Sequence, residues 1–333
     1  MLITLDTTSD RNYAEFRDSL FCFKLGRRLE SNRGKFTVNK LKIVLVLSYL
    51  IALNSQANVF IYKGPENSDD QRYQYVQKVL QLALNKTKQE YGDFELKATS
   101  EDINLGRLLL QMDKDIYPNY FFKISITDEL LEKFHVIQFP VDRGVSGYRI
   151  AFINQQRKES FCPIENIESL RKQVVVQGIG WLDGEILKYN GINVYALANY
   201  RSMFELVSLN RVDLFFRAIN EIKNEYEAEQ RNFPNLMIEP CIALYYPLPR
   251  FFVTAKNNIE NANRIEKGLK IAYADGSFIK LWEEYFLDSI ELVKLKNRTL
   301  LKLENPYIRG LDPGYKKYNY LLPEKVTTVS LLH

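Results

Sequence analysis

The sequence predicts an α/β protein in which mainly parallel sheets are flanked by helices. The chain has 333 residues, 46% of them hydrophobic, which is enough to bury the cores of two ordinary domains. From residue 58 onward, short apolar segments with strand character alternate with segments of helical periodicity, and most connections are short. Two long extended stretches, 146–154 and 242–255, bracket the middle of the chain. Such alternation is typical of parallel strands joined by helices that cover both faces of a sheet.

Residues 38–57 are expected to be a cleaved signal peptide, which implies a periplasmic location. Lys40 and Lys42 precede an apolar run over 43–53, and small and polar residues follow up to Ala57. The run is about half of the roughly 20 apolar residues that cross a bilayer, so cleavage is favoured over a membrane anchor. Residues 1–37 have mixed charge and no periodicity. We expect them to be an unstructured extension, absent if translation starts at Val38, and N-terminal sequencing of the secreted protein should then give Asn58 first.

The first part of the remaining chain is predicted as strand, helix, strand, helix and strand. Residues 58–62 form the first strand, and a helix over 69–92 follows, with Gly92 where a helix C-cap is expected. One stripe of this helix is apolar, at Val76, Val79, Leu80, Ala83, Leu84 and Thr87. The next elements are a strand at 94–99, a helix at 103–112, an extended segment at 115–124 and a strand at 134–141.

The alternation resumes after a gap and continues to residue 216. Its elements are a strand at 147–153, a short helix at 167–171, a strand at 173–177, a helix at 181–190 closed by Gly191, a strand at 192–197, a helix at 199–209 and a strand at 211–216. Helices return after residue 255, where Ile259, Ala262, Ile265 and Leu269 have helical spacing.

Charge and residue counts argue against several classes of function. Of the 45 Lys and Arg and the 41 Asp and Glu residues, nine and five lie within residues 1–57, which leaves 36 of each in residues 58–333. A nucleic-acid partner is therefore not expected, because no concentrated basic face is present. With only two histidines and no metal-ligand spacing, phosphate loop or nucleophile–base pair, we expect no metal, no cofactor and no catalytic residues. Two free buried thiols at Cys162 and Cys241 are favoured over a disulfide, which stays open as the alternative.

Several motifs, taken in order, resemble those of the bacterial extracellular solute-binding proteins of family 3, the type II periplasmic binding proteins that serve ABC importers. The resemblance spans about residues 58–310, and none of its motifs is specific alone. Within the family, "GIGWLDGEIL" resembles an uncharacterised subgroup. The other matching stretches are "SITDEL" followed by "VIQFPV", "VVVQGIG", "RVDLFF" and "FFVTAKNN".

The resemblance implies two α/β lobes joined by two hinge strands. Residues 58–141 and 255–330 would form lobe 1, residues 148–240 would form lobe 2, and 142–147 and 241–254 would be the hinge crossings. Closure of such lobes is driven by contacts that form only when both lobes touch the solute, so the cleft between them is the expected site.

Two ligand contacts that the resemblance implies for amino-acid-binding members are missing here. Leu130 stands where an arginine would pair with an α-carboxylate, and Ala218 stands where an aspartate would accept an α-ammonium group. Without these partners a zwitterion would be desolvated without compensation, so an ordinary α-amino acid is not expected.

The candidate ligand-binding residues of lobe 2 are Gly178, Gly180, Trp181, Asp183 and Arg217. The glycines and the helix after them would offer backbone N–H groups, and Arg217 would add positive charge, which favours an anionic solute. Each has an alternative role. The glycines are common in tight turns, Trp181 suits a core or a stacking surface equally, Asp183 fits the helix dipole better than a ligand, and Arg217 suits a pair with Glu221.

The candidates of lobe 1 are Tyr62, Lys63, Ser125 and Thr127, which lie at strand ends or in the family motif. Asp70 is interpreted as a helix N-cap. Arg143 and Arg149 flank the first hinge strand, and the sequence does not decide whether either reaches the cleft.

Together these features predict a secreted, monomeric, non-catalytic protein that closes two lobes on a small, polar, anionic solute and delivers it to an ABC permease. One alternative is a ligand-sensing partner of a membrane signalling receptor. A third, ranked below both, is a secreted lyase or dehydratase that uses Asp183, Glu185 or Glu221 as general acid or base.

Overall fold

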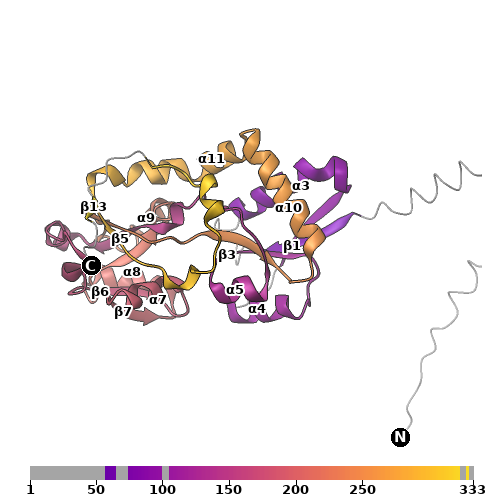
Figure 1. Cartoon of the computed structure of the whole chain (residues 1–333). Helices are drawn as coiled ribbons and strands as arrows, with labels where there is room; N and C mark the ends of the chain where they lie inside the picture. Colours follow the sequence, from indigo (N-terminus) through magenta and orange to yellow (C-terminus); the bar gives the residue numbers. More distant parts are fainter. Residues whose placement is uncertain (1–56, 65–73, 100–104, 323–327, 330–333) are drawn as a thin grey trace, which may run out of the picture. The chain divides into compact units, whose positions relative to one another are not determined.

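The structure is a computed structural model that describes residues 57–64, 74–99, 105–322 and 328–329 (Figure 1). The expected extension 1–37, all of the signal peptide except Ala57, and Asp70 lie outside the described residues. Within the described residues, no helix has both the length and the apolar character that crossing a membrane requires.

The first lobe is built on a five-stranded sheet with the order β2-β1-β3-β11-β4. β1, β2 and β3 are parallel, whereas β11 runs antiparallel to its neighbours because it enters this lobe directly from the other one, without a crossover helix. The strands are β1 (Asn58–Lys63), β2 (Phe94–Thr99), β3 (Tyr120–Ser125), β4 (His135–Ile137) and β11 (Arg250–Thr254).

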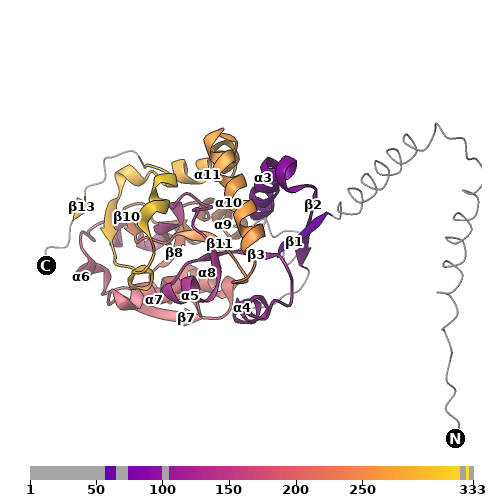
Figure 2. The same cartoon turned by 45° about the vertical axis from the view of Figure 1, so that its right-hand side comes forward.

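Helices cover both faces of this sheet. α3 (Gln74–Tyr91) and α10 (Ile259–Ala274) lie side by side on one face (Figure 2), and all six residues of the predicted α3 stripe are buried. Gly92 has a φ of 79° and ends α3, as the sequence predicts. α4 (Leu105–Asp113) and α5 (Asp128–Lys133) supply apolar side chains to the core of the other face.

The second lobe is built on a six-stranded sheet with the order β13-β12-β10-β5-β8, in which β9 also pairs with β5. Its central pairs are antiparallel, so this sheet is more mixed than the alternation of helices and strands predicts. The strands are β5 (Tyr148–Asn154), β8 (Phe215–Ala218), β9 (Leu236–Ile238), β10 (Ile242–Tyr245), β12 (Thr299–Lys302) and β13 (Thr328–Val329), with a separate parallel pair of β6 (Val174–Gly178) and β7 (Asn193–Leu197).

Four helices flank the second lobe. α6 (Ile167–Leu170) and α7 (Leu182–Tyr189) pack on one face, and α8 (Tyr200–Ser208) and α9 (Ile222–Glu229) pack on the other. The predicted two-lobed α/β class is confirmed. Two strands begin several residues later than expected: β3 starts five residues into the extended segment at 115–124, and β8 starts four residues into the strand at 211–216.

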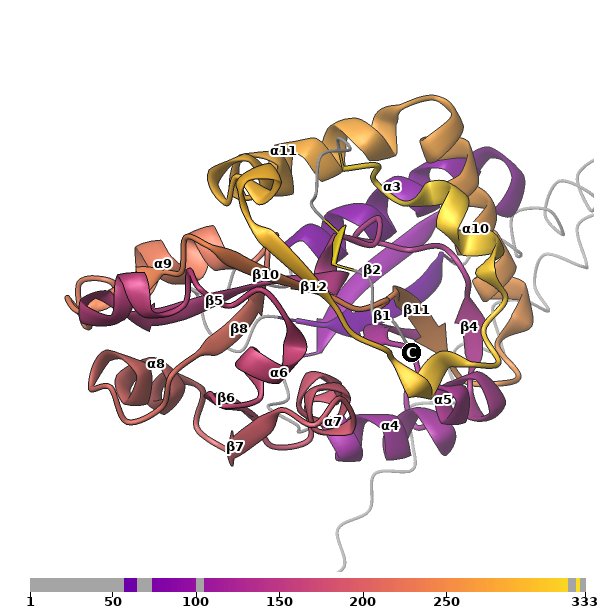
Figure 3. The ribbon, with the colours of Figure 1, turned by 60° about the vertical axis from the view of Figure 1, so that its left-hand side comes forward.

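The C-terminal part of the chain crosses between the lobes more often than expected. α11 (Ser277–Leu292) leads to β12, which pairs in parallel with β10 of the second sheet (Figure 3). This placement differs from the expectation that all of 255–330 belongs to lobe 1. The edge of β10 offers free backbone groups, and β12 satisfies them. The chain then returns to lobe 1, where the backbone N–H groups of Arg309 and Gly310 donate to the Asp128 carboxylate.

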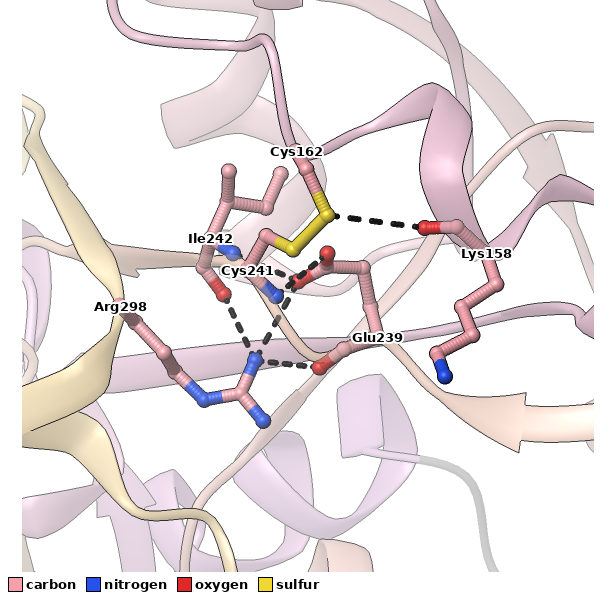
Figure 4. Close-up of a disulfide and its surroundings, with 6 residues drawn as sticks. All are labelled: Lys158, Cys162, Glu239, Cys241, Ile242 and Arg298. Carbon is pink, nitrogen blue, oxygen red and sulfur yellow. Dashed lines mark hydrogen bonds and ion pairs between the residues drawn. A yellow bond between two sulfur atoms is a disulfide. The ribbon is translucent and has the colours of Figure 1, made fainter.

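Cys162 and Cys241 form a disulfide, so the prediction of two free thiols is wrong (Figure 4). They are 79 residues apart in sequence, but Cys162 lies shortly after β5 and Cys241 directly precedes β10, and these strands are neighbours in the sheet. The Glu239 carboxylate accepts hydrogen bonds from the backbone N–H of Cys241 and of Ile242, and it pairs with Arg298. Although Cys162, Glu239 and Cys241 bring potential metal-ligand atoms within 4.8 Å of one another, these atoms are already engaged in the bonds above.

Candidate functional site

Charged side chains from both lobes meet at one place, which we call the interlobe cluster. Arg250 begins β11 in lobe 1, and its Nη1 lies 3.0 Å from Oε1 of Glu221, which follows β8 in lobe 2. Glu221 also lies 2.9 Å from Nη2 of Arg217 on β8. The interlobe cluster consists of Lys123, Arg217, Glu221, Glu225 and Arg250.

The lobe 1 side of the cluster follows from strand register. Arg250 pairs with Ser125 and Phe252 pairs with Lys123 in the antiparallel ladder of β11 and β3. Because directly opposite residues of a ladder share a face, Arg250, Ser125 and Lys123 lie on the same face of the sheet. The Arg250 Nε donates to the Ser125 hydroxyl over 3.4 Å. Lys123 makes neither a hydrogen bond nor an ion pair with any described residue, and its Nζ lies 6.0 Å from the ring centroid of Tyr75.

On the lobe 2 side, the guanidinium of Arg217 contacts two carboxylates and lies close to three aromatic rings. Arg217 Nε donates to both carboxylate oxygens of Glu225, at 3.0 and 2.8 Å. Its guanidinium carbon lies 4.9 Å from the Trp181 ring centroid, and the rings of Tyr200 and Phe215 are also close. Arg217 therefore pairs with Glu221, as the alternative interpretation expects, and with Glu225 as well.

Burial and neighbouring charges shift the pKa values of two members of this cluster, Lys123 and Glu221. Burial and the nearby charge of Arg250 together lower the pKa of Lys123 to about 8, although Asp142 and Glu221 act in the opposite direction. Burial would raise the pKa of Glu221, but Arg217, Arg250, Arg149 and Lys123 together hold it below its ordinary value. Glu221 is thus ionised at neutral pH, whereas Lys123 titrates just above it.

The glycine turn after β6 is shaped by Trp181. A Cβ atom at Gly178 would lie 2.3 Å from Cε2 of Trp181, so only glycine lets the indole pack against the backbone. Gly180 has a φ of 78°, a conformation that side chains disfavour, and nothing lies within 4 Å of the position of its missing Cβ. The turn orients Trp181 toward Arg217, and Ile179 at its tip is 63% exposed.

Asp183 has a structural partner rather than a position in the interlobe cluster. Its Oδ1 lies 2.6 Å from Nη2 of Arg149 and accepts a hydrogen bond from the Tyr246 hydroxyl at 2.5 Å. Arg149 is 1% exposed and belongs to β5, and Tyr246 belongs to the second crossing. These contacts therefore fasten the first turn of α7 to β5 and to the second crossing.

The candidates of lobe 1 divide between the cluster and other roles. Ser125 contacts Arg250 as described. The Thr127 hydroxyl accepts a hydrogen bond from the Leu130 backbone N–H and caps α5, and Tyr62 is 4% exposed within the core. Lys63 ends β1 and is partly buried. Leu130, where the sequence resemblance implies an arginine, packs into the core under α4 and α5.

Three members of the interlobe cluster, Lys123, Glu225 and Arg250, are not among the candidates that the sequence suggests. Lys123 interrupts an otherwise apolar strand, which is the one signal that marked it. Arg250 and Glu225 carry no local signal, because their roles depend on which strands and helices meet across the lobes. Arg143 and Arg149, left undecided by the sequence, both lie outside the cluster.

Comparisons with known proteins identify the fold. No protein-family model and no curated protein sequence matches the chain. Among solved structures, an ancestral arginine-binding protein bound to glutamine is 14% identical, with a TM-score of 0.51 over 69% of this chain and 99% of the other. A periplasmic binding protein of Salmonella typhimurium with high arginine specificity is 12% identical, with a TM-score of 0.50 over 69% and 100%. An amino acid ABC transporter substrate-binding protein of Streptococcus pneumoniae, bound to L-arginine, is 14% identical, with a TM-score of 0.50 over 70% and 96%. The resemblance inferred from the motifs is thus confirmed at the level of the two-lobed fold.

Proposed function

We propose that this chain, which has the two-lobed fold of periplasmic binding proteins, is a secreted solute-binding protein that closes its lobes on a small polar solute. An ABC importer would then receive the solute. The cleft residues would be those of the interlobe cluster together with Trp181 and Ser125. The salt bridge between Arg250 and Glu221 carries the proposal, because it joins charged groups of the two lobes at the place where a solute would touch both.

The solute is proposed to carry an anionic group that binds Lys123. Both carboxylates of the cluster are already paired, Glu221 with Arg217 and Arg250, and Glu225 with Arg217. Lys123 is the cation of the cluster that no described carboxylate pairs with, so a carboxylate or phosphate of the solute would compensate its charge. The aromatic faces of Trp181 and Tyr200 beside Arg217 suit a flat or apolar part of the same solute.

A non-catalytic role is proposed because Glu221, the carboxylate that joins the two lobes, is held as an ion. A general acid at neutral pH needs a raised pKa, whereas the pKa of Glu221 lies below its ordinary value. Asp183 is buried in its pair with Arg149. Glu221 is therefore not poised to exchange a proton with a solute, and Asp183 is committed to its contacts with Arg149 and Tyr246.

The test is a thermal-shift screen of residues 58–333 against dicarboxylic acids, phosphates, L-arginine, L-glutamine and neutral sugars. A ligand at 100 times its Kd adds about 2.7 kcal/mol to the free energy of unfolding. We expect an anion among the hits and a weakening of roughly tenfold or more in Lys123→Met, while Lys172→Met, a change of an exposed lysine, keeps wild-type affinity. Binding of L-arginine that Lys123→Met leaves unchanged would overturn the anionic assignment.

Transport and signalling roles predict different effects of gene deletion on uptake of the solute. Deleting the gene should abolish uptake of the solute found in the screen if the partner is a permease. An unchanged uptake rate would exclude the transport role and leave the sensing role.

A further inference from the structure

A hollow lies away from the interlobe cluster, where lobe 1 meets the start of the first crossing. It has a volume of about 470 Å³, within the range of small-molecule sites. Its walls come from the start of the first crossing, α10, α11 and the segment after β12. We call it the Arg143 pocket, and the lining residues that matter here are Arg143, Tyr273, Lys316, Lys317, Asn319 and Tyr320.

Arg143 is held rigidly at this pocket. It is 9% exposed, its Nε donates to the Tyr318 carbonyl at 3.3 Å, and its own carbonyl accepts from the Tyr320 backbone N–H at 2.8 Å. The guanidinium carbon lies 4.8 Å from the Trp282 ring centroid and 5.4 Å from that of Tyr320. Only Nε of the guanidinium is hydrogen-bonded to a described residue, so both Nη atoms remain available.

Arg143 has no carboxylate partner among the described residues, unlike three other arginines that are largely buried. Arg149 pairs with Asp183, Arg217 with Glu225, and Arg298 with Glu239. Fully buried Arg264 also has no carboxylate, but its Nη atoms donate to the backbone carbonyls of Tyr91 and Gly92. A desolvated guanidinium without a counter-charge is unfavourable, and an anion in the pocket would supply that charge.

The other lining residues add positive charge, an amide and aromatic rings to the Arg143 pocket. Lys316 and Lys317 add two positive charges and form no ion pair with a described residue, whereas Glu283 is the one acid that lines the pocket. The side-chain amide of Asn319 makes no hydrogen bond within the described part of the chain, and its Oδ1 is buried. Tyr273 and Tyr320 supply aromatic walls.

We propose that the Arg143 pocket binds a small organic anion with a flat apolar body, of the aromatic carboxylate class. The carboxylate would pair with the Nη atoms of Arg143 and with Lys316 or Lys317, the Asn319 amide would take a polar substituent, and the ring would lie against Tyr273 and Tyr320. This site goes beyond the proposed cleft function and does not depend on it, because none of its lining residues belongs to the interlobe cluster.

The test is calorimetric titration of residues 58–333 with benzoate, and with benzamide as the neutral counterpart of the same shape. We expect saturable benzoate binding that is roughly tenfold or more tighter than benzamide binding. The double variant Lys316→Gln/Lys317→Gln should weaken benzoate binding by roughly tenfold, and the matched double variant Lys172→Gln/Lys296→Gln, at exposed lysines elsewhere, should not.

Two further variants test whether Arg143 holds the carboxylate and whether benzoate binds in this pocket or at the interlobe cluster. Arg143→Lys keeps the charge but loses the planar pair of Nη donors, so we expect weaker benzoate binding without loss of the fold, checked by thermal unfolding. Lys123→Met should leave benzoate binding unchanged. The proposal is overturned if benzoate does not saturate by about 20 mM, if Lys316→Gln/Lys317→Gln binds like the wild type, or if Lys123→Met abolishes binding, which would place benzoate in the cleft.

Discussion

Arg250 of lobe 1 and Glu221 of lobe 2 form a salt bridge across the lobes, with 3.0 Å between Nη1 and Oε1. Their side chains are 22% and 23% exposed, so the pair contributes about 1 kcal/mol to closure rather than the larger energy of a dry pair. A closed form held by so small a contribution can still open to admit a solute.

Removing this pair should therefore shift the lobes toward the open form. In Arg250→Met we expect the open-to-closed ratio to rise roughly fivefold, and a larger radius of gyration in small-angle X-ray scattering. Lys188→Met breaks an exposed pair with Glu185 inside lobe 2 and should leave the scattering unchanged. If Arg250→Met scatters like the wild type, the pair does not hold the lobes together.

The pKa of Lys123 predicts how solute affinity depends on pH. Lys123 has a pKa of about 8 in the folded protein, against an ordinary value of 10.5, so its charge is lost as pH rises through about 8. Affinity for an anion should fall roughly fivefold between pH 8 and pH 9, measured by calorimetry. Lys123→Arg stays charged and should bind with a flat profile, and a flat profile in the wild type would contradict the role of Lys123.

Stability should change with pH in the opposite direction. Between about pH 8 and 10.5 the unfolded chain holds a proton on Lys123 that the folded protein has lost, so the free energy of unfolding gains from this group as pH rises. Urea unfolding of wild type and Lys123→Met across this window isolates the contribution. Because anion affinity falls while the free energy of unfolding rises with pH, a loss of binding can be distinguished from a loss of folding.

Asp183→Asn should lower stability because it leaves the buried Arg149 without its counter-charge. We expect a loss of about 3–5 kcal/mol in urea unfolding. Glu185→Gln changes an exposed carboxylate two residues away on the same helix and should cost less than about 0.5 kcal/mol. Equal stability of the two variants would mean that Asp183 is not the structural partner of Arg149.

Gly178→Ala should displace Trp181. The added Cβ would meet the indole at 2.3 Å, so the ring must move away from the backbone and from Arg217, with a change in tryptophan fluorescence. Gly184→Ala on α7 has neighbours at 3.7 Å or more and should be tolerated, with a gain of up to about 1 kcal/mol from helix propensity. An unchanged spectrum in Gly178→Ala would refute this account of the turn.

The disulfide should stabilise the second lobe strongly. It links residues 79 apart, and replacing both cysteines by alanine should lower the free energy of unfolding by about 4 kcal/mol on the chain-entropy account. Reduction with dithiothreitol should cause a similar loss in the wild type and none in the double variant. A wild type indifferent to the reductant would show that the bond does not form.

Local patterns predicted much of the secondary structure. The α3 stripe and Gly92, the strand at 94–99 and the helix that ends before Gly191 need only periodicity and capping residues. β8 was misplaced because both the predicted and the observed segments contain Phe215 and Phe216, and the pairing with β5 selects the later start. The position of β12 in the second sheet has no local signal at all.

The site was predicted less well because its contacts join distant parts of the chain. Arg217 and Trp181 were candidates, and the structure stacks them together. Arg250 was not a candidate, since its contact with Glu221 exists only once the second crossing has placed β11 beside β3. The disulfide failed as a prediction for the same reason, because a spacing of 79 residues says nothing about which strands are neighbours.

A crystal structure of the protein with the best anion from the screen tests the central claim most directly. We predict that the anionic group contacts Lys123 Nζ while another part of the same molecule touches Trp181 or Tyr200 on the opposite lobe. A solute bound to one lobe alone, or bound with Lys123 left free of it, would contradict the account.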